Sequence, residues 1–253
     1  MNTEAAAGAG GPPKKNTVTA LDAGSPPNGK VKGIVDLVFL MDATGSLDIC
    51  IEQVKNNLRD FIGYLTGGPA NQTPVKEWRA KVVGFRDFDF DAEPLVDNPF
   101  TDDPTVLEGQ LASLKAEGGG DIPECLLEGI MHCAEMGQTE KGEQLSPDKW
   151  RHRSAGARVV IVFTDAPFKD PMVWDKGGDI DDVSNACSNN KIILQVFAPE
   201  MDCFYELGEI DKSDCYLLEY DESDPEGAVK ALNEFTSRGD FKEILAKRIL
   251  PGC

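Results

Sequence analysis

One run of nine residues limits the fold of this chain more than any other feature. Residues 33–41 (GIVDLVFLM) are almost continuously apolar and rich in β-branched side chains. An alternating pattern would indicate a strand with one face in water, whereas a continuous run indicates a strand that is covered on both faces. Such strands are typical of α/β proteins, in which helices pack on both sides of a parallel sheet.

Further apolar runs alternate with helical patterns along the rest of the chain. The runs at 80–86, 158–164, 191–198 and 214–219 predict four more strands, and 93–98 predicts a short antiparallel strand. Between these runs, apolar residues recur at helical spacing, as they do from Leu47 to Leu65. We therefore expect an α/β fold with a doubly wound, mainly parallel, Rossmann-like sheet and helices on both faces. One further helix is predicted to begin near residue 103, and others to cover 124–136, 181–188, 225–238 and 241–248.

The first 32 residues have a different composition. They consist largely of Ala, Gly, Pro, Ser, Asn and Lys, and such a segment cannot bury enough apolar surface to offset the entropy lost on ordering. We predict a disordered leader at residues 1–32 and one folded domain at 33–253. The leader lacks the pattern of a secretion signal, and no apolar run reaches the roughly 18–20 residues of a membrane span.

Charge and cysteine content restrict the class of partner and the compartment. The formal net charge is −19, and the leader carries more Lys than Asp and Glu, so residues 33–253 hold all of the excess negative charge. This balance disfavours nucleic acids and favours cations or basic proteins; with no membrane-spanning run, we expect no membrane partner. The seven cysteines form no CxxC pair and no zinc spacing, which predicts reduced, buried thiols in a cytoplasmic protein.

Polar residues stand where two of the predicted strands end. Asp42 follows the first strand and is itself followed by Thr44 and Ser46, while Asp165 follows the strand at 158–164. Asp121 lies on a glycine-rich loop that opens a helix. Because the carboxyl ends of parallel strands line the ligand crevice of α/β sheets, these side chains are expected to converge there if the two strands are neighbours. Three carboxylates and two hydroxyls predict an all-oxygen site for Mg²⁺, or for Ca²⁺ or Mn²⁺, rather than for zinc.

The segment DATGS at 42–46 resembles the DxSxS or DxTxS signature of the metal-ion-dependent adhesion site (MIDAS) of von Willebrand factor A-type (vWA) domains. The segments GGGDIPE at 118–124 and FTDAP at 163–167 follow in the order of that family. GFRD at 84–87 is similar to a stretch of the vWA subgroup found in hemicentins and in proteins linked to alpha-type kinases. The resemblance covers about residues 33–250, and it implies a vWA domain that binds a protein partner through a divalent cation and has no catalytic activity.

The resemblance also implies roles for individual residues. Thr44 and Ser46 would bind the ion through their hydroxyls, and Asp42 and Asp165 would bind it directly or through water. Asp121 stands where adhesive members of the family have threonine, and a third carboxylate would make the ion less attractive to a partner's acidic side chain. Alternatively, Asp121 caps the helix that follows it.

Two other functional classes remain open. In the first, the protein is a structural subunit of a larger assembly, and the metal only stabilises loops. In the second, it is a phosphohydrolase of the haloacid-dehalogenase type, which would need a second Asp two residues after Asp42, where this chain has Thr44. The second class is disfavoured further because no phosphate-binding loop is present and neither histidine lies beside the motifs.

A second group of acidic residues follows the strand at 80–86. Asp87, Asp89 and Asp91 are predicted to form a solvated strand end, with a second cation site as the alternative. His132 and His152 have no metal-binding partner at a useful spacing, and the three tryptophans are expected to serve in packing.

Overall fold

The first predicted strand lies in the middle of the sheet, in a computed structural model that describes residues 33–67, 75–120 and 122–249. β1 (Ile34–Asp42) pairs in parallel with β2 (Glu77–Phe85) on one side and with β4 (Ala157–Phe163) on the other. All residues of β1 except Ile34 are buried, because helices cover both faces of the sheet. The leader predicted at residues 1–32 lies outside the described residues.

The remaining strands complete a six-stranded sheet in the order β3-β2-β1-β4-β5-β6. β5 (Ile192–Pro199) and β6 (Ser213–Leu218) continue the parallel arrangement, and β3 (Leu95–Asp97) pairs antiparallel with β2. The predicted fold class, a mainly parallel α/β sheet with one short antiparallel strand, is therefore confirmed.

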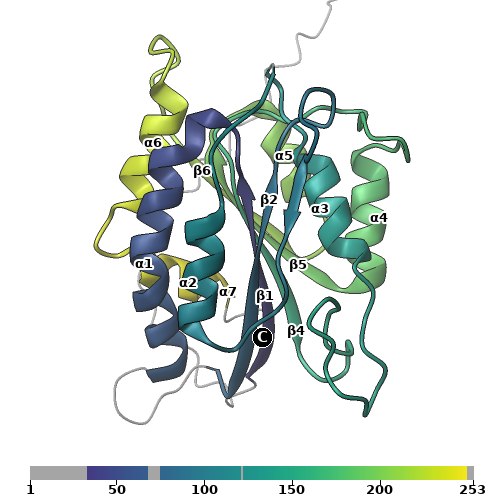
Figure 1. Ribbon diagram of the computed structural model, residues 1–253. Coiled ribbons are helices and arrows are strands. Elements are labelled where there is room, and N and C mark those ends of the chain that lie inside the picture. Colours follow the sequence, from purple (N-terminus) through teal and green to yellow (C-terminus); the bar gives the residue numbers. More distant parts are fainter. Residues whose placement is uncertain (1–32, 68–74, 121, 250–253) are drawn as a thin grey trace, which may run out of the picture. The chain divides into compact units, whose positions relative to one another are not determined.

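Helices lie on both faces of this sheet (Figure 1). One face carries α1 (Asp48–Gly67), α2 (Pro104–Ser113), α6 (Gly227–Thr236) and α7 (Phe241–Ile249). The other face carries α3 (Leu126–Glu135), α4 (Ile180–Asn190) and α5 (Asp202–Gly208). A 3-10 turn, η1 (Gly45–Leu47), joins β1 to α1. No helix in these described ranges is long and apolar enough to span a membrane.

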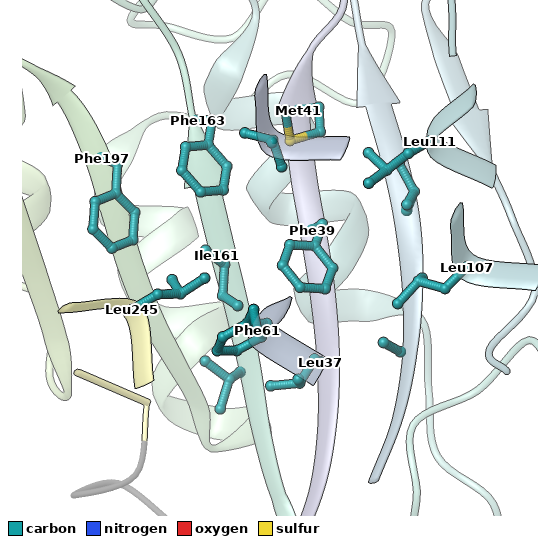
Figure 2. Packing of buried hydrophobic residues seen from close by; sticks show 14 of the residues in the cluster. Leu37, Phe39, Met41, Phe61, Leu107, Leu111, Ile161, Phe163, Phe197 and Leu245 are labelled. Atoms are coloured by element: carbon teal, nitrogen blue, oxygen red, sulfur yellow. The ribbon is translucent and has the colours of Figure 1, made fainter. Parts of the chain in front are cut away.

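Side chains of alternate strand residues build the two layers of the core. Figure 2 shows Phe39, Phe163 and Phe197 on the face toward α1 and α7, where Phe61 and Leu245 pack against them. The rings of Phe163 and Phe197 stack with their centroids 5.2 Å apart. This packing holds β1, β4 and β5 side by side and fixes the positions at which they end.

A buried ion cluster fastens the opposite, amino-terminal end of β1. Asp36 is fully buried, and its carboxylate accepts hydrogen bonds from Arg79 Nε at 2.8 Å and Nη2 at 2.7 Å. It also accepts the backbone N–H of Arg151 at 2.6 Å and Arg151 Nε at 3.1 Å. Arg79 further donates to the carbonyls of Ser146 and Lys149. The loop at 138–153, which is polar in sequence, is thus bound to the sheet by charge.

The described cysteines are free thiols, and four of them are buried: Cys50, Cys125, Cys133 and Cys187. Burial raises the pKa of Cys50 and of Cys187 to about 12, so neither forms a reactive thiolate at neutral pH. Cys253 lies outside the described residues. These thiols contribute to packing.

Candidate metal centre

The two strand-end aspartates lie next to each other. β1 ends at Asp42, and its neighbour β4 ends at Phe163, the residue that pairs with Met41. Asp165 follows two residues after the end of β4. The sequence left open whether these strands are adjacent, and the sheet order places them side by side at its carboxyl edge.

Asp42 is held rigidly at the end of β1. Its Oδ1 accepts the backbone N–H of Thr44 at 3.0 Å and the Thr44 hydroxyl at 2.6 Å, and its Oδ2 accepts the Thr164 hydroxyl at 2.9 Å. The residue is fully buried. Burial and the nearby charge of Asp165 raise the pKa of Asp42 to about 7. The site therefore concentrates negative charge that a bound cation would offset.

The two predicted hydroxyl ligands stand on the loop and turn after β1. Thr44 is buried, whereas Ser46 is exposed on η1, and their hydroxyl oxygens are 3.4 Å apart. Asp165 is 8% exposed, and its Oδ1 is buried with no hydrogen-bond partner in the described part of the chain. Burial raises the pKa of Asp165, while a hydrogen bond with Ser46 opposes the change. Four of the five predicted ligands thus occupy one edge of the sheet.

Glu124 is a carboxylate of this region that the sequence analysis did not select. It is buried, and its Oε2 has no hydrogen-bond partner among the described residues. Burial, with the charges of Asp42, Asp87 and Asp165, raises the pKa of Glu124 to about 8. The sequence did contain one signal that could have identified Glu124. It is the last residue of GGGDIPE, a charged residue directly before the apolar start of a helix.

The backbone ties Glu124 to the loop that carries Asp165. The N–H of Glu124 donates to the carbonyl of Pro167 at 2.7 Å, and the carbonyl of Glu124 accepts the N–H of Lys169 at 2.8 Å. The two carboxylates therefore belong to one hydrogen-bonded unit.

The predicted solvated strand end holds for Asp89, which is exposed, but not for Asp87. Asp87 is fully buried, and Lys169 Nζ donates to its two carboxylate oxygens at 3.1 and 3.0 Å. The same ammonium donates to Asp89 at 3.2 Å. The prediction of a solvated end is wrong for Asp87, because a lysine 82 residues later in the chain supplies the counter-charge. The ammonium of Lys169 also lies between Asp87 and Asp89, where the alternative prediction had put a second metal cation.

Asp91 holds the glycine-rich loop against the site. Its Oδ2 accepts the backbone N–H groups of Asp87 at 3.1 Å and Gly119 at 3.0 Å. A Cβ on Gly119 would lie 3.2 Å from the Thr44 side chain and 3.7 Å from Glu124 Oε1, so this loop passes directly over both residues. Asp121 itself lies outside the described residues, and its predicted role as a ligand or a helix cap remains a prediction.

The donor set fits a hard divalent cation. Two hydroxyls lie at one sheet edge with three buried carboxylates, two of which have a partnerless oxygen, and hard cations such as Mg²⁺ prefer oxygen ligands. Within the described ranges, no group of three or more His, Cys, Asp or Glu could hold an ion by itself. A cation at this edge would therefore depend on the hydroxyls of Thr44 and Ser46 as well as on carboxylates.

Gly118 offers a test of the glycine loop. Gly118 has a φ of +85°, and a Cβ there would lie 2.0 Å from Asp91 Oδ1, so Gly118→Ala should displace Asp91 and weaken divalent-cation binding about tenfold. Gly142→Ala is the matched control, because Gly142 has a φ of +90° and open space around the position of a Cβ. Both variants carry the strain of a left-handed alanine, about 1–2 kcal/mol. Cation titrations followed by thermal unfolding that gave equal affinities for both would contradict the assigned role of the loop.

Comparison with known proteins supports a vWA domain. Residues 36–143 match the family model described as the von Willebrand factor A domain. Proximal thread matrix protein 1 from the mussel byssus, solved with a zinc-occupied MIDAS motif, has a similar fold with a TM-score of 0.52 and 12% identity. The alignment covers 85% of this chain and 46% of the mussel chain, so this chain spans just under half the length of that structure.

A second solved structure gives a weaker likeness. The pilus adhesin SpaC from Lactobacillus rhamnosus GG aligns with a TM-score of 0.49 and 11% identity, over 86% of this chain and 31% of SpaC. A search of curated proteins finds no match. The family model, the mussel structure and the sheet topology together show a vWA-like α/β fold.

Proposed function

We propose that this vWA domain binds a protein partner through a divalent cation held by Asp42, Thr44, Ser46 and Asp165. Asp121 is proposed as a further ligand on sequence grounds, and Glu124 is added because of its position. The observation that carries the proposal is the pair of buried, partnerless carboxylate oxygens on Asp165 and Glu124 beside the two hydroxyls. A buried polar atom without a partner is costly, and a bound cation would remove that cost.

Mg²⁺ is the proposed ion, with Ca²⁺ or Mn²⁺ as alternatives, because every candidate ligand is an oxygen. When bound, the ion would supply positive charge at the sheet edge and an open position for an oxygen of the partner. Asp42 would orient Thr44 through the two hydrogen bonds that it accepts from that residue. Thr164 would fix the other carboxylate oxygen of Asp42.

The charge of the site decides which partner group it suits. Asp42, Asp165 and Glu124 are carboxylates, and Asp121 adds a fourth by sequence where adhesive vWA domains have threonine. A dication among these groups has little positive charge left for a partner's Asp or Glu. We therefore infer that the partner contributes a neutral oxygen, or approaches with basic side chains.

We also propose kinship with the vWA subgroup of hemicentins and alpha-kinase-linked proteins, and Arg86 belongs to the GFRD segment that suggests it. Its guanidinium donates to the carbonyls of Ala43 at 3.3 Å and Lys115 at 2.8 Å. Arg86 thus links the loop after β1 to the residues that lead into the glycine-rich loop. The GFRD segment therefore helps to position the loops of the proposed metal site.

The same contacts bear on the rival functions. A metal that only stabilises loops has little to add where Lys169 and Asp91 already fasten them. Neither histidine is placed to act as a base at this site, because His132 bonds to Asp97 at 3.1 Å and His152 to Ser154 at 2.8 Å. We accordingly propose a non-catalytic protein, and we place it in the cytoplasm because its cysteine pattern suits a reducing compartment.

Affinity capture from native extract tests this function. The full chain should recover a partner in stoichiometric amounts in millimolar Mg²⁺, and should lose it in EDTA. Asp42→Asn should fail to recover the partner in either buffer. A partner retained equally in EDTA would favour the structural subunit, and hydrolytic turnover lost in Asp42→Asn would favour an enzyme.

A further inference from the structure

β6 forms one edge of the described sheet and pairs only with β5. Every residue of β5 is buried, whereas β6 has no fully buried residue, although helices lie over both faces of the sheet. This partial exposure is typical of an edge strand, whose outer side has no neighbouring strand. Such an edge can pair with an added strand.

The register identifies the backbone groups on the open side. The carbonyl of Lys212 accepts the N–H of Leu194 at 3.3 Å, and that of Leu218 accepts the N–H of Glu200 at 2.8 Å. Even-numbered residues of β6 therefore direct their backbone groups toward β5. Because successive residues of a strand alternate, Cys215 and Leu217 direct their N–H and C=O groups outward. No contact within the described ranges occupies these four groups.

The charge around this edge determines what it can accept. Residues 200–226 contain eleven Asp or Glu and one Lys. Asp211 lies just before β6 and Glu219 just after it, and both are exposed, whereas the exposed Asp214 within β6 already pairs with Arg248. A second copy of this acidic chain would be repelled from the edge, whereas a basic segment would be attracted.

The opposite edge is less suited to strand addition. β3 has only three residues, and beyond it Ala80 of β2 is already bridged by Thr101. β6 has six residues and an outward row of donors and acceptors. It is therefore the edge with space for an added strand.

We propose that β6 binds an extended, Lys- or Arg-containing segment of a partner protein, which adds to the sheet as a further strand. Its backbone pairs with Cys215 and Leu217, and its basic side chains lie near Asp211 and Glu219. Acidic edge residues also prevent self-association, so the same charges exclude copies of the chain and select the partner. This surface is separate from the proposed metal site, and binding here does not require the cation.

A synthetic ten-residue peptide of alternating Lys and Val tests the proposal with the full chain. We expect saturable binding by fluorescence anisotropy in EDTA, together with slower amide hydrogen exchange at Cys215 and Leu217. A peptide with Glu in place of Lys should not bind. Loss of the Lys–Val signal in EDTA, or protection confined to the loops around Asp42, would overturn the proposal and leave the metal-site function standing.

Leu217→Pro provides the sharpest variant. Proline removes an N–H that faces away from β5, so the existing ladder stays intact, and proline is tolerated on edge strands. The variant should fold, as circular dichroism would show, but bind the peptide at least tenfold more weakly. Leu217→Val keeps the N–H and should bind normally. Equal binding by the two variants would rule out strand addition.

Charge neutralisation tests the choice of partner. Replacing Asp211 and Glu219 together by their amides should weaken binding about three- to tenfold at low salt, and less at high salt. The lysine-containing leader is the other occupant that the experiment must distinguish. Tighter peptide binding after all four lysines of residues 1–32 are replaced by glutamine would show that the leader occupies the edge, and would overturn the assignment to a partner.

Discussion

Replacing Asp36 with asparagine is expected to lower the free energy of unfolding by about 3–5 kcal/mol, because two buried guanidiniums lose their counter-charge. The side chains of Arg79 and Arg151 are only 7% and 6% exposed, so water cannot replace the carboxylate. At about 2–4 °C per kcal/mol for a domain of this size, the melting temperature should fall by roughly 10 °C. Urea denaturation followed by circular dichroism measures the effect.

Glu77→Gln is the matched control for this prediction. Glu77 also pairs with Arg151, but its side chain is 53% exposed, and exposed pairs contribute about 0–1 kcal/mol. A loss in Asp36→Asn no larger than that in Glu77→Gln would show that the amino-terminal ion cluster does not hold the 138–153 loop. Comparing the two variants separates the effect of a buried counter-charge from the effect of losing any ion pair with Arg151.

Asp42→Asn should abolish stabilisation by divalent cations while leaving the cation-free protein intact. In the wild type, an ion at one hundred times its dissociation constant stabilises the native state by about 2.7 kcal/mol. An asparagine Oδ1 can still accept the two hydrogen bonds from Thr44. In the variant, the Thr164 hydroxyl can donate its hydrogen to the carbonyl of Ala166, 3.3 Å away. Its oxygen can then accept a hydrogen bond from the amide of the new asparagine. The substitution also removes the repulsion between Asp42 and Asp165.

Thermal unfolding across a Mg²⁺ titration measures both parts of this prediction. Asp48→Asn removes the same charge from an exposed position in the first turn of α1 and should respond to Mg²⁺ as the wild type does. A full Mg²⁺ response in Asp42→Asn would mean that the ion binds elsewhere. A strong loss of stability without the ion would mean that the charge of Asp42 is needed for folding.

Local sequence patterns predicted the strands and the acids at their ends. The continuous apolar run at 33–41 indicated β1, and the residue that follows such a run must lie at the carboxyl edge of the sheet. The positions of Asp42 and Asp165 could therefore be predicted without any knowledge of side-chain contacts. Glu124 and Lys169 were not, because their environments depend on loops that meet only in three dimensions.

Two elements show where such patterns fail. β2 begins at Glu77, three residues earlier than predicted, because Arg79 looks solvated in sequence but is buried by pairing with Asp36. α5 was not predicted at all. It has seven residues, of which Phe204 and Leu207 are buried, and this is too short a stretch to display helical periodicity.

The ion pair between Lys169 and Asp87 gives the carboxyl edge of the sheet one permanent positive charge, beside the proposed site for an exchangeable cation. A covalently attached ammonium is not diluted, chelated or washed away, so the loops meet whether or not divalent ions are present. A divalent ion at the proposed site would therefore bind to loops that are already assembled, and little ordering entropy would oppose its binding. Occupancy should consequently follow free ion concentration as a single-site isotherm, with almost no change in backbone conformation between the empty and the loaded protein.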